Sequence, residues 1–263
     1  TVSENAWCRG TSAESCMYLP LNSQATVIDI LRGIIIQSGN DASKAVAEHL
    51  AGSEPAFAAM MNNEAKRLGM KNTNFMNATG LPDPAHKASA RDLAILARAI
   101  IHDSSEYYSL YAEKEFTFNG IKQGNRNLLL FRDPTVDGLK TGHTQAAGYC
   151  LVASAKRDFP NVGARRLLSV VLGADSENAR ANESQKLLNW GYSAFDAVKL
   201  FDANQAVVTP AIWKGKASVV KLGSMRPLVV AIPSGSAAQL KTEVVRPDPL
   251  VAPLSSAEAL MLA

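Results

Sequence analysis

The stretch Val136-Asp137-Gly138-Leu139-Lys140-Thr141-Gly142-His143-Thr144 decides how this chain is interpreted. We expect its tripeptide Lys140-Thr141-Gly142 to begin a strand that is accessible at the edge of a sheet. Far upstream stands Ser38-Gly39-Asn40, which we expect at a break between two helices. Either tripeptide alone is weak evidence, because Ser3-Glu4-Asn5 and Ser176-Glu177-Asn178 also have the Ser-x-Asn form. The two together, in this order, are much more specific.

The side chains of the two tripeptides suit acyl transfer through a serine, which needs a nucleophile, a base, a proton relay and donors for the oxyanion. Ser38 at a tight turn could pass a proton between a buried lysine and a departing nitrogen. Asn40 could place its amide beside a substrate carbonyl. Lys140 could offer a positive charge to a substrate carboxylate and hold Ser38 in its orientation.

The residues after Lys140 complete this expected site. Thr141 offers a hydroxyl donor to the same substrate carboxylate. Gly142 lets a substrate lie alongside the strand, because it has no Cβ. The backbone N–H of His143 could contribute to an oxyanion hole. These residues would form one wall of a serine acyl-transfer site.

Length and composition set the broad class. With 263 residues, 47% of them hydrophobic, the chain can build one large or two modest domains. Its 27 basic and 24 acidic side chains leave a net charge of +3, which gives no electrostatic case for a nucleic-acid partner. No apolar stretch approaches the roughly 18 to 20 residues of a membrane span.

Histidine and cysteine usage indicates neither a metal nor another cofactor. The 4 histidines show no metal-ligand spacing, and none of the 3 cysteines stands in a Cys-x-x-Cys. Cys8 and Cys16 are close enough in sequence to form one loop disulfide in an oxidising compartment. We favour free cysteines that pack as small apolar side chains.

Apolar residues at three- and four-residue spacing predict several helices. One helix starts at Ser23 and is interrupted at Gly39; Asp41 opens the next, and Gly69 ends a third as its C-cap. The predicted helices include residues 42–51, 54–68, a segment from Ser89 past Ile100, and 182–198, with a long loop over 72–87.

The other segments favour strands. Phe116-Thr117-Phe118 with Asn119-Gly120 reads as a strand that leads into a turn. Residues 148–155 and 167–172 are predicted strands joined by a polar connection. From about residue 200 the chain alternates Val-rich strands with Gly and Pro turns. We therefore expect an α/β domain, its sheet packed by helices, over residues 1–199 and a smaller all-β domain over 200–263.

At these residues the chain resembles the low-molecular-mass penicillin-binding proteins, D-alanyl-D-alanine carboxypeptidases of the Gram-negative type. Longer runs carry the resemblance beyond the tripeptides: residues 36–42, 113–121, 125–127 and 183–188. It implies a penicillin-binding/β-lactamase-like transpeptidase domain followed by a smaller all-β domain. It also implies a periplasmic enzyme, peripheral to the inner membrane, that removes the terminal D-alanine of peptidoglycan stem pentapeptides through a serine acyl-enzyme, and that β-lactam antibiotics acylate.

The resemblance also bears on single residues. Ser38, Asn40 and residues 140–142 match the family's motifs. Arg126 and Arg180 fall where the family carries basic residues near the site, and we expect them to help attract the substrate carboxylate.

Two features of the family are expected outside this sequence. The nucleophilic serine and the base lysine belong to a Ser-x-x-Lys that we expect upstream of Thr1, and the family's membrane anchor is a C-terminal amphipathic helix not present here. The one Ser-x-x-Lys in the sequence, Ser218 to Lys221, lies in the β-rich part. There, residues three apart point to opposite faces of a strand, so we interpret it as a chance match.

Two alternatives stay open. A class A β-lactamase shares the motifs, but it needs a deacylating glutamate between them, and no glutamate there stands in a Glu-x-x-Leu-Asn pattern. A catalytically silent penicillin-fold module that only binds peptidoglycan is the alternative from a different class.

Overall fold

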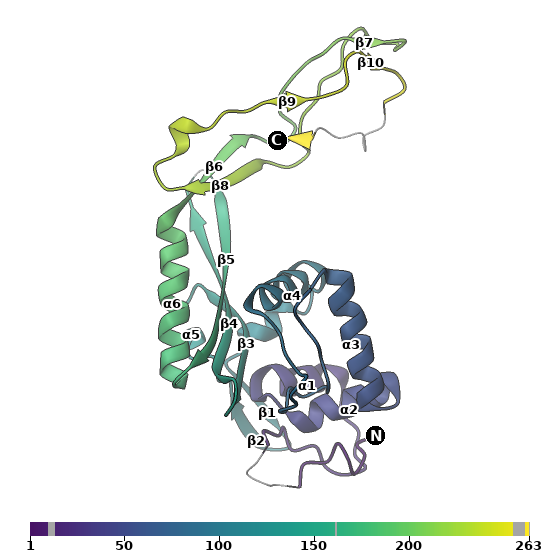
Figure 1. The fold of residues 1–263 in the computed structure, drawn as a ribbon, viewed down its shortest axis with the longest axis vertical. Coiled ribbons are helices and arrows are strands. Elements are labelled where there is room, and N and C mark those ends of the chain that lie inside the picture. Colours follow the sequence, from purple (N-terminus) through teal and green to yellow (C-terminus); the bar gives the residue numbers. More distant parts are fainter. Residues whose placement is uncertain (10–13, 161, 255–260, 263) are drawn as a thin grey trace. The chain divides into compact units, whose positions relative to one another are not determined.

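The computed structural model describes residues 1–9, 14–160, 162–254 and 261–262, which form two compact units (Figure 1). The first unit comprises Thr1–Arg157 and Arg166–Asn189. The second comprises Asp158–Arg165 and the described residues from Trp190 onward. The domain boundary near residue 200 stays a prediction.

Most helices of the first unit precede its sheet in sequence, and the long helix α6 follows the sheet. The helical elements are α1 (Val27–Arg32), the π-helix η1 (Gly33–Gln37), α2 (Asn40–Ala51), α3 (Glu54–Leu68), α4 (Ala90–Asp103), the 3-10 helix η2 (Tyr108–Ala112), α5 (Leu129–Arg132) and α6 (Glu177–Ala194). Figure 1 shows α6 along one side of the sheet of this unit and α1 to α4 on its other side. The expected sheet packed by helices is confirmed.

The helix signals of the sequence are confirmed for α3 and need a correction at α2. Ser53 Oγ accepts the N–H of Ala56 at the start of α3, and Gly69 ends it with a φ of 81°. Helix α2 starts at Asn40 with Gly39 as its N-cap, so Asp41 does not open it. The carboxylate of Asp41 instead accepts the backbone N–H groups of Met17 and Leu19.

The central sheet has the strand order β3-β4-β5, with β3 (Val136–Thr144), β4 (Gly148–Phe159) and β5 (Gly163–Ala174). Strand β3 runs antiparallel to β4, with Lys140 opposite Val152 and Gly142 opposite Cys150, and it is the edge of this sheet as described. The Lys-Thr-Gly tripeptide therefore lies inside the strand and does not begin it. The predicted polar connection over residues 156–166 is largely absorbed by the two longer strands.

A hairpin and the N-terminal segment complete the first unit. Strand β1 (Glu115–Phe118) pairs with β2 (Ile121–Gly124) around the predicted turn at Asn119-Gly120. The lead-in before α1 has little regular structure, yet Met17 and Leu19 are fully buried. They pack with Ile30 and other apolar side chains. The segment that lacks periodicity is thus part of the core.

The cysteine expectation was wrong. Cys8 and Cys16 form a disulfide with their Cα atoms 6.2 Å apart, inside the range that disulfides use. Cys150 is a free cysteine. Spacing alone does not reveal whether two cysteines lie within bonding distance of each other.

The second unit is β-rich. Helix α6 (Glu177–Ala194) begins earlier than the predicted residue 182 and ends earlier than the predicted residue 198. It ends there because Phe195–Phe201 forms strand β6, which pairs antiparallel with β8 (Leu228–Pro233). The remaining elements are short: β7 (Ile212–Trp213), η3 (Ala237–Gln239), β9 (Val244–Val245), β10 (Leu250–Val251) and β11 (Met261–Leu262). No helix among the described residues has both the length and the apolar character of a membrane span.

Candidate functional site

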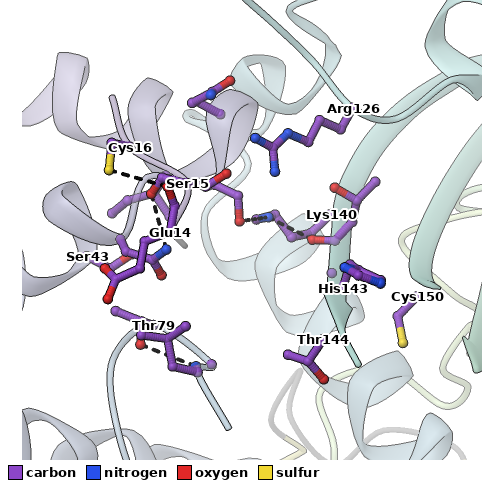
Figure 2. Close-up of a pocket in the computed structure, with 18 of the residues that line it drawn as sticks. Glu14, Ser15, Cys16, Ser43, Thr79, Arg126, Lys140, His143, Thr144 and Cys150 are labelled. Carbon is purple, nitrogen blue, oxygen red and sulfur yellow. Dashed lines mark hydrogen bonds between the residues drawn. The ribbon is translucent and has the colours of Figure 1, made fainter. Parts of the chain in front are cut away.

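A cavity of about 880 Å³ in the first unit brings the two tripeptides of the sequence together. Ser38 and Asn40 line one part of it, and residues 140–144 of β3 line another. Figure 2 shows Lys140, His143, Thr144 and Cys150 on one side and Glu14, Ser15, Cys16 and Ser43 on the opposite side.

Ser38 occupies the corner between η1 and α2, as the sequence predicts. Its φ of 61° and ψ of 40° place it in the left-handed region, which is uncommon for a residue other than glycine and is concentrated at functional sites. The Ser38 N–H donates to the carbonyl of Gly33, which closes the end of the π-helix. The sharp turn presents the serine hydroxyl at the cavity.

Lys140 reaches that hydroxyl from β3. Its Nζ donates to Ser38 Oγ at 2.9 Å and to the carbonyl of Thr141 at 2.8 Å. Burial, together with the positive charges of Arg126 and Arg180, lowers the pKa of Lys140 to about 8. The lysine is therefore mostly protonated at neutral pH but close to the range in which it exchanges a proton.

Side chains hold the edge strand β3 where no further strand pairs with it in the described sheet. Asn127, fully buried, donates from Nδ2 to the carbonyl of Gly138 at 3.1 Å. Arg180 donates from Nη1 to the carbonyl of Gly142 at 3.2 Å. Together with the contact from Lys140 to the Thr141 carbonyl, these bonds fix the strand at the tripeptide.

Arg180 is more deeply embedded than the sequence suggests. Only 2% exposed, it also donates to the carbonyl of Arg126 at 3.3 Å and lies 3.5 Å from Glu177. Its guanidinium stands over the ring of Tyr149, and burial lowers its pKa. It therefore supports β3 while its charge acts on the cavity, and a role of Arg126 and Arg180 in binding a carboxylate stays a prediction.

The remaining predicted site residues also line the cavity. Thr141 and Gly142 do so from β3, and His143 stacks on Tyr149 with ring centroids 4.0 Å apart. Asn40 donates from Nδ2 to the carbonyl of Ser15 at 3.1 Å. The structure thus brings all eight predicted residues to one cavity, while their chemical roles stay predictions.

The opposite wall was missed by sequence reasoning. Residues 14–16, Tyr18 and residues 78–81 line it, and Lys44 pairs with Glu14 beside it at 3.2 Å. Asn77 Oδ1 accepts the N–H groups of Thr79 and Gly80, which shapes the second segment. Neither segment has periodicity; the Asn-rich turn composition of residues 72–80 was the one available signal.

Ser218 and Lys221 belong to the second compact unit, whereas the residues that line the cavity all belong to the first. Among the described residues, no group of three or more His, Cys, Asp or Glu side chains is placed to hold a metal ion.

Two family models match this chain. The one described as D-alanyl-D-alanine carboxypeptidase matches residues 1–176, and the one described as penicillin-binding protein 5, C-terminal domain, matches residues 195–261. The fold is that of the penicillin-binding transpeptidases, followed by a β-rich C-terminal domain. The chain belongs to the D-alanyl-D-alanine carboxypeptidase family, as its motifs predict.

Individual proteins named as D-alanyl-D-alanine carboxypeptidases or penicillin-binding proteins are similar to this chain in sequence and structure. The chain is 44% identical over 265 residues to the D-alanyl-D-alanine carboxypeptidase DacC of Escherichia coli (strain K12), covering 99% of this chain and 65% of that protein. It is 43% identical over 262 residues to DacA of Haemophilus influenzae, covering 99% and 66%. It is similar to the structure of penicillin binding protein 5 from Haemophilus influenzae, with a TM-score of 0.85, 44% identity, and 97% of this chain and 74% of that chain covered. The chain spans slightly less than two thirds of the length of the two relatives.

Proposed function

We propose that this protein is a serine-type D-alanyl-D-alanine carboxypeptidase that removes the terminal D-alanine from peptidoglycan stem pentapeptides through an acyl-enzyme. Family membership and the names of the relatives support this activity. The observation that carries the proposal is the contact of 2.9 Å from Lys140 Nζ to Ser38 Oγ. It joins the two tripeptides of the sequence into one chemical unit.

The contact suits Ser38 to relay a proton. The ammonium of Lys140 donates to Ser38 Oγ, so the hydroxyl hydrogen of Ser38 remains available for another acceptor. A departing D-alanine nitrogen beside Ser38 could receive that hydrogen as the acyl-enzyme forms. Ser38 would recover a proton from the nucleophile or its base, which is general acid–base catalysis by a positioned hydroxyl.

The charges around Lys140 suit the carboxylate at the end of the substrate. Arg126 and Arg180 are close enough to lower the pKa of Lys140 by repulsion, so three cations act on the same part of the cavity. An anion bound among them would relieve that repulsion. Thr141 Oγ1 and the open surface of Gly142 would complete this carboxylate site, with the His143 N–H as a donor to the oxyanion.

The proposal requires a nucleophilic serine with a lysine base beside Ser38. We place both in the family's Ser-x-x-Lys, which precedes the Ser-x-Asn motif, whereas the match at Ser218 follows both motifs in the sequence. The residues described here then supply the proton relay and the wall that binds the substrate carboxylate.

The partners and compartment follow from the same proposal. Peptidoglycan stem peptides are the substrates, and β-lactams acylate the same serine. The Cys8–Cys16 disulfide suits an oxidising compartment such as the periplasm. We propose that the protein acts there, peripheral to the inner membrane and attached through a C-terminal anchor.

Release of D-alanine from a peptide ending in D-alanyl-D-alanine tests the activity. The full-length protein should release it, and Lys140→Ala should lower the rate by orders of magnitude, because the lysine's role is electrostatic. Lys156→Ala, a change at an exposed lysine of β4, is the matched control. Near-normal release by Lys140→Ala would remove that lysine from the site. Binding of peptidoglycan without release would support the silent module, and rapid penicillin turnover would support a class A β-lactamase, which the family match disfavours.

A further inference from the structure

Asp41 follows the site residue Asn40 but is not among the residues that line the cavity. It is 1% exposed, and both of its carboxylate oxygens are engaged by backbone donors. Oδ1 accepts the N–H of Met17 at 2.9 Å, and Oδ2 accepts the N–H of Leu19 at 3.0 Å. A buried carboxylate therefore binds the first residues of α2 to a segment distant in sequence.

The same segment also holds Asn40. The carbonyl of Ser15 accepts the backbone N–H of Asn40 at 2.8 Å and its Nδ2 at 3.1 Å. Hydrogen bonds thus run in both directions between the start of α2 and residues 15–19. Gln123 on β2 adds a further bond from Nε2 to the carbonyl of Met17 at 3.0 Å.

The packing at this junction is tight. A Cβ at Gly39 would lie 2.9 Å from Asp41 Oδ1 and 3.1 Å from the backbone nitrogen of Met17, so the middle residue of the Ser-x-Asn tripeptide has no room for a side chain. Ser38 and Asn40 line the cavity together with Ser15, Cys16 and Tyr18 of this segment. A shift of residues 15–19 would be transmitted to both Ser38 and Asn40.

We propose that Asp41 is a positioning residue: by fixing residues 15–19 it sets the orientation of the Asn40 amide at the cavity. The inference rests on the proposed acyl-transfer function. The Asn40 side chain donates one of its two Nδ2 hydrogens to the carbonyl of Ser15. This bond fixes the orientation of the other N–H and of the amide oxygen. If residues 15–19 moved, the amide would lose that orientation.

The chemistry of this junction requires a carboxylate. An ionised carboxylate only accepts hydrogen bonds, whereas an amide at residue 41 would turn an NH₂ toward one of two N–H donors. Asp92 is a matched control: it is also 1% exposed, lies in the first turn of α4, and accepts the N–H of Asn72 at 2.7 Å and the hydroxyl of Thr73 at 2.8 Å. It does not line the cavity.

The test compares Asp41→Asn with Asp92→Asn in the full-length protein. Three quantities are measured: the rate of acylation by a labelled penicillin, the thermal midpoint, and the NMR signals of the Asn40 side-chain amide. We expect similar losses of thermal midpoint. Only Asp41→Asn should slow acylation, by about tenfold to hundredfold as for a misplaced catalytic group, and shift the Asn40 signals. Equal acylation and equal Asn40 signals in the two variants would overturn the proposal.

Two further results distinguish a failure of the positioning role of Asp41 from a failure of the proposed acyl-transfer function. If the unchanged protein is not acylated, the proposed function fails, while the Asn40 signals still decide whether Asp41 positions the amide. If Asp41→Asn does not fold, Gln123→Met loosens the same segment through Met17. It should slow acylation several-fold and shift the Asn40 signals, and unchanged values would overturn the proposal.

Discussion

Replacing Lys140 with methionine should raise the stability of the fold while it removes the function. Lowering the pKa of a lysine from 10.5 to about 8 corresponds to about 3 kcal/mol of unfavourable free energy when the side chain is charged. Methionine has a similar length and no charge to desolvate. The variant loses the hydrogen bonds to Ser38 Oγ and to the Thr141 carbonyl. Each lost bond costs about 1 kcal/mol of stability, which offsets part of the gain from removing the buried charge. We expect a net gain of about 1 kcal/mol at pH 7.

The pH dependence isolates the charge from those lost bonds. Because the pKa of Lys140 is lower in the folded state, the unfolded chain binds more protons between about pH 8 and pH 10.5. The stability of the unchanged protein therefore rises with pH in this window, relative to the variant, by roughly 2.5 kcal/mol between pH 7 and pH 10. Denaturant unfolding of both proteins at the two pH values measures the difference. Lys156→Met, a lysine replaced at an exposed position of β4, is the matched control. A constant difference between Lys140→Met and the unchanged protein would refute the argument that burial depresses this pKa.

Three further predictions concern the parts that hold the site. Arg180→Gln removes a positive charge that lowers the pKa of Lys140, so the alkaline limb of the acylation–pH profile should move to higher pH, and carboxylate substrates should bind more weakly. Loss of the Cys8–Cys16 disulfide by double alanine substitution should cost about 2.5 kcal/mol in denaturant unfolding, from the entropy of its short loop. Gly138→Ala should cost about 1–3 kcal/mol in thermal unfolding, because its Cβ would lie 2.8 Å from the Tyr108 hydroxyl.

Each of these has a matched comparison. Arg132→Gln, at an exposed arginine, should leave the pH profile in place. Cys150→Ala should leave the response of the protein to reductant unchanged, because Cys150 is a free cysteine. Gly142→Ala should cost little stability, since its Cβ would meet Cys150 Cβ at an ordinary 3.9 Å. A pH profile that stays fixed in Arg180→Gln, or equal losses for the two glycine variants, would contradict the geometry on which the predictions rest.

Local sequence signals predicted the elements that depend on local chemistry. The helix α3 was predicted with its bounds, since the glycine that ends it directly follows its last residue in the sequence. The meeting of Ser38 and Lys140 was also predicted, because the required chemistry demands both groups at one place. The choice of helix or strand at Phe195 was not, since pairing with β8 decides it and that partner lies far along the chain.

The second wall of the cavity was beyond the sequence for a similar reason. Residues 14–19 have no periodicity, and their place is set by Asp41, Gln123 and the disulfide rather than by their own preferences. The carboxylate of Asp41 reads in sequence as a helix start, and its long-range partners appear only in the fold. Tertiary hydrogen bonds override local signals at this site.

The mass of the full-length protein after incubation with a labelled penicillin tests the central claim most directly, when it is followed by mapping of the labelled peptide. We predict one covalent adduct on the serine of a Ser-x-x-Lys that precedes the Ser38 motif, formed much more slowly when Lys140 is replaced by alanine. An unmodified protein, or an adduct on Ser218, would contradict it.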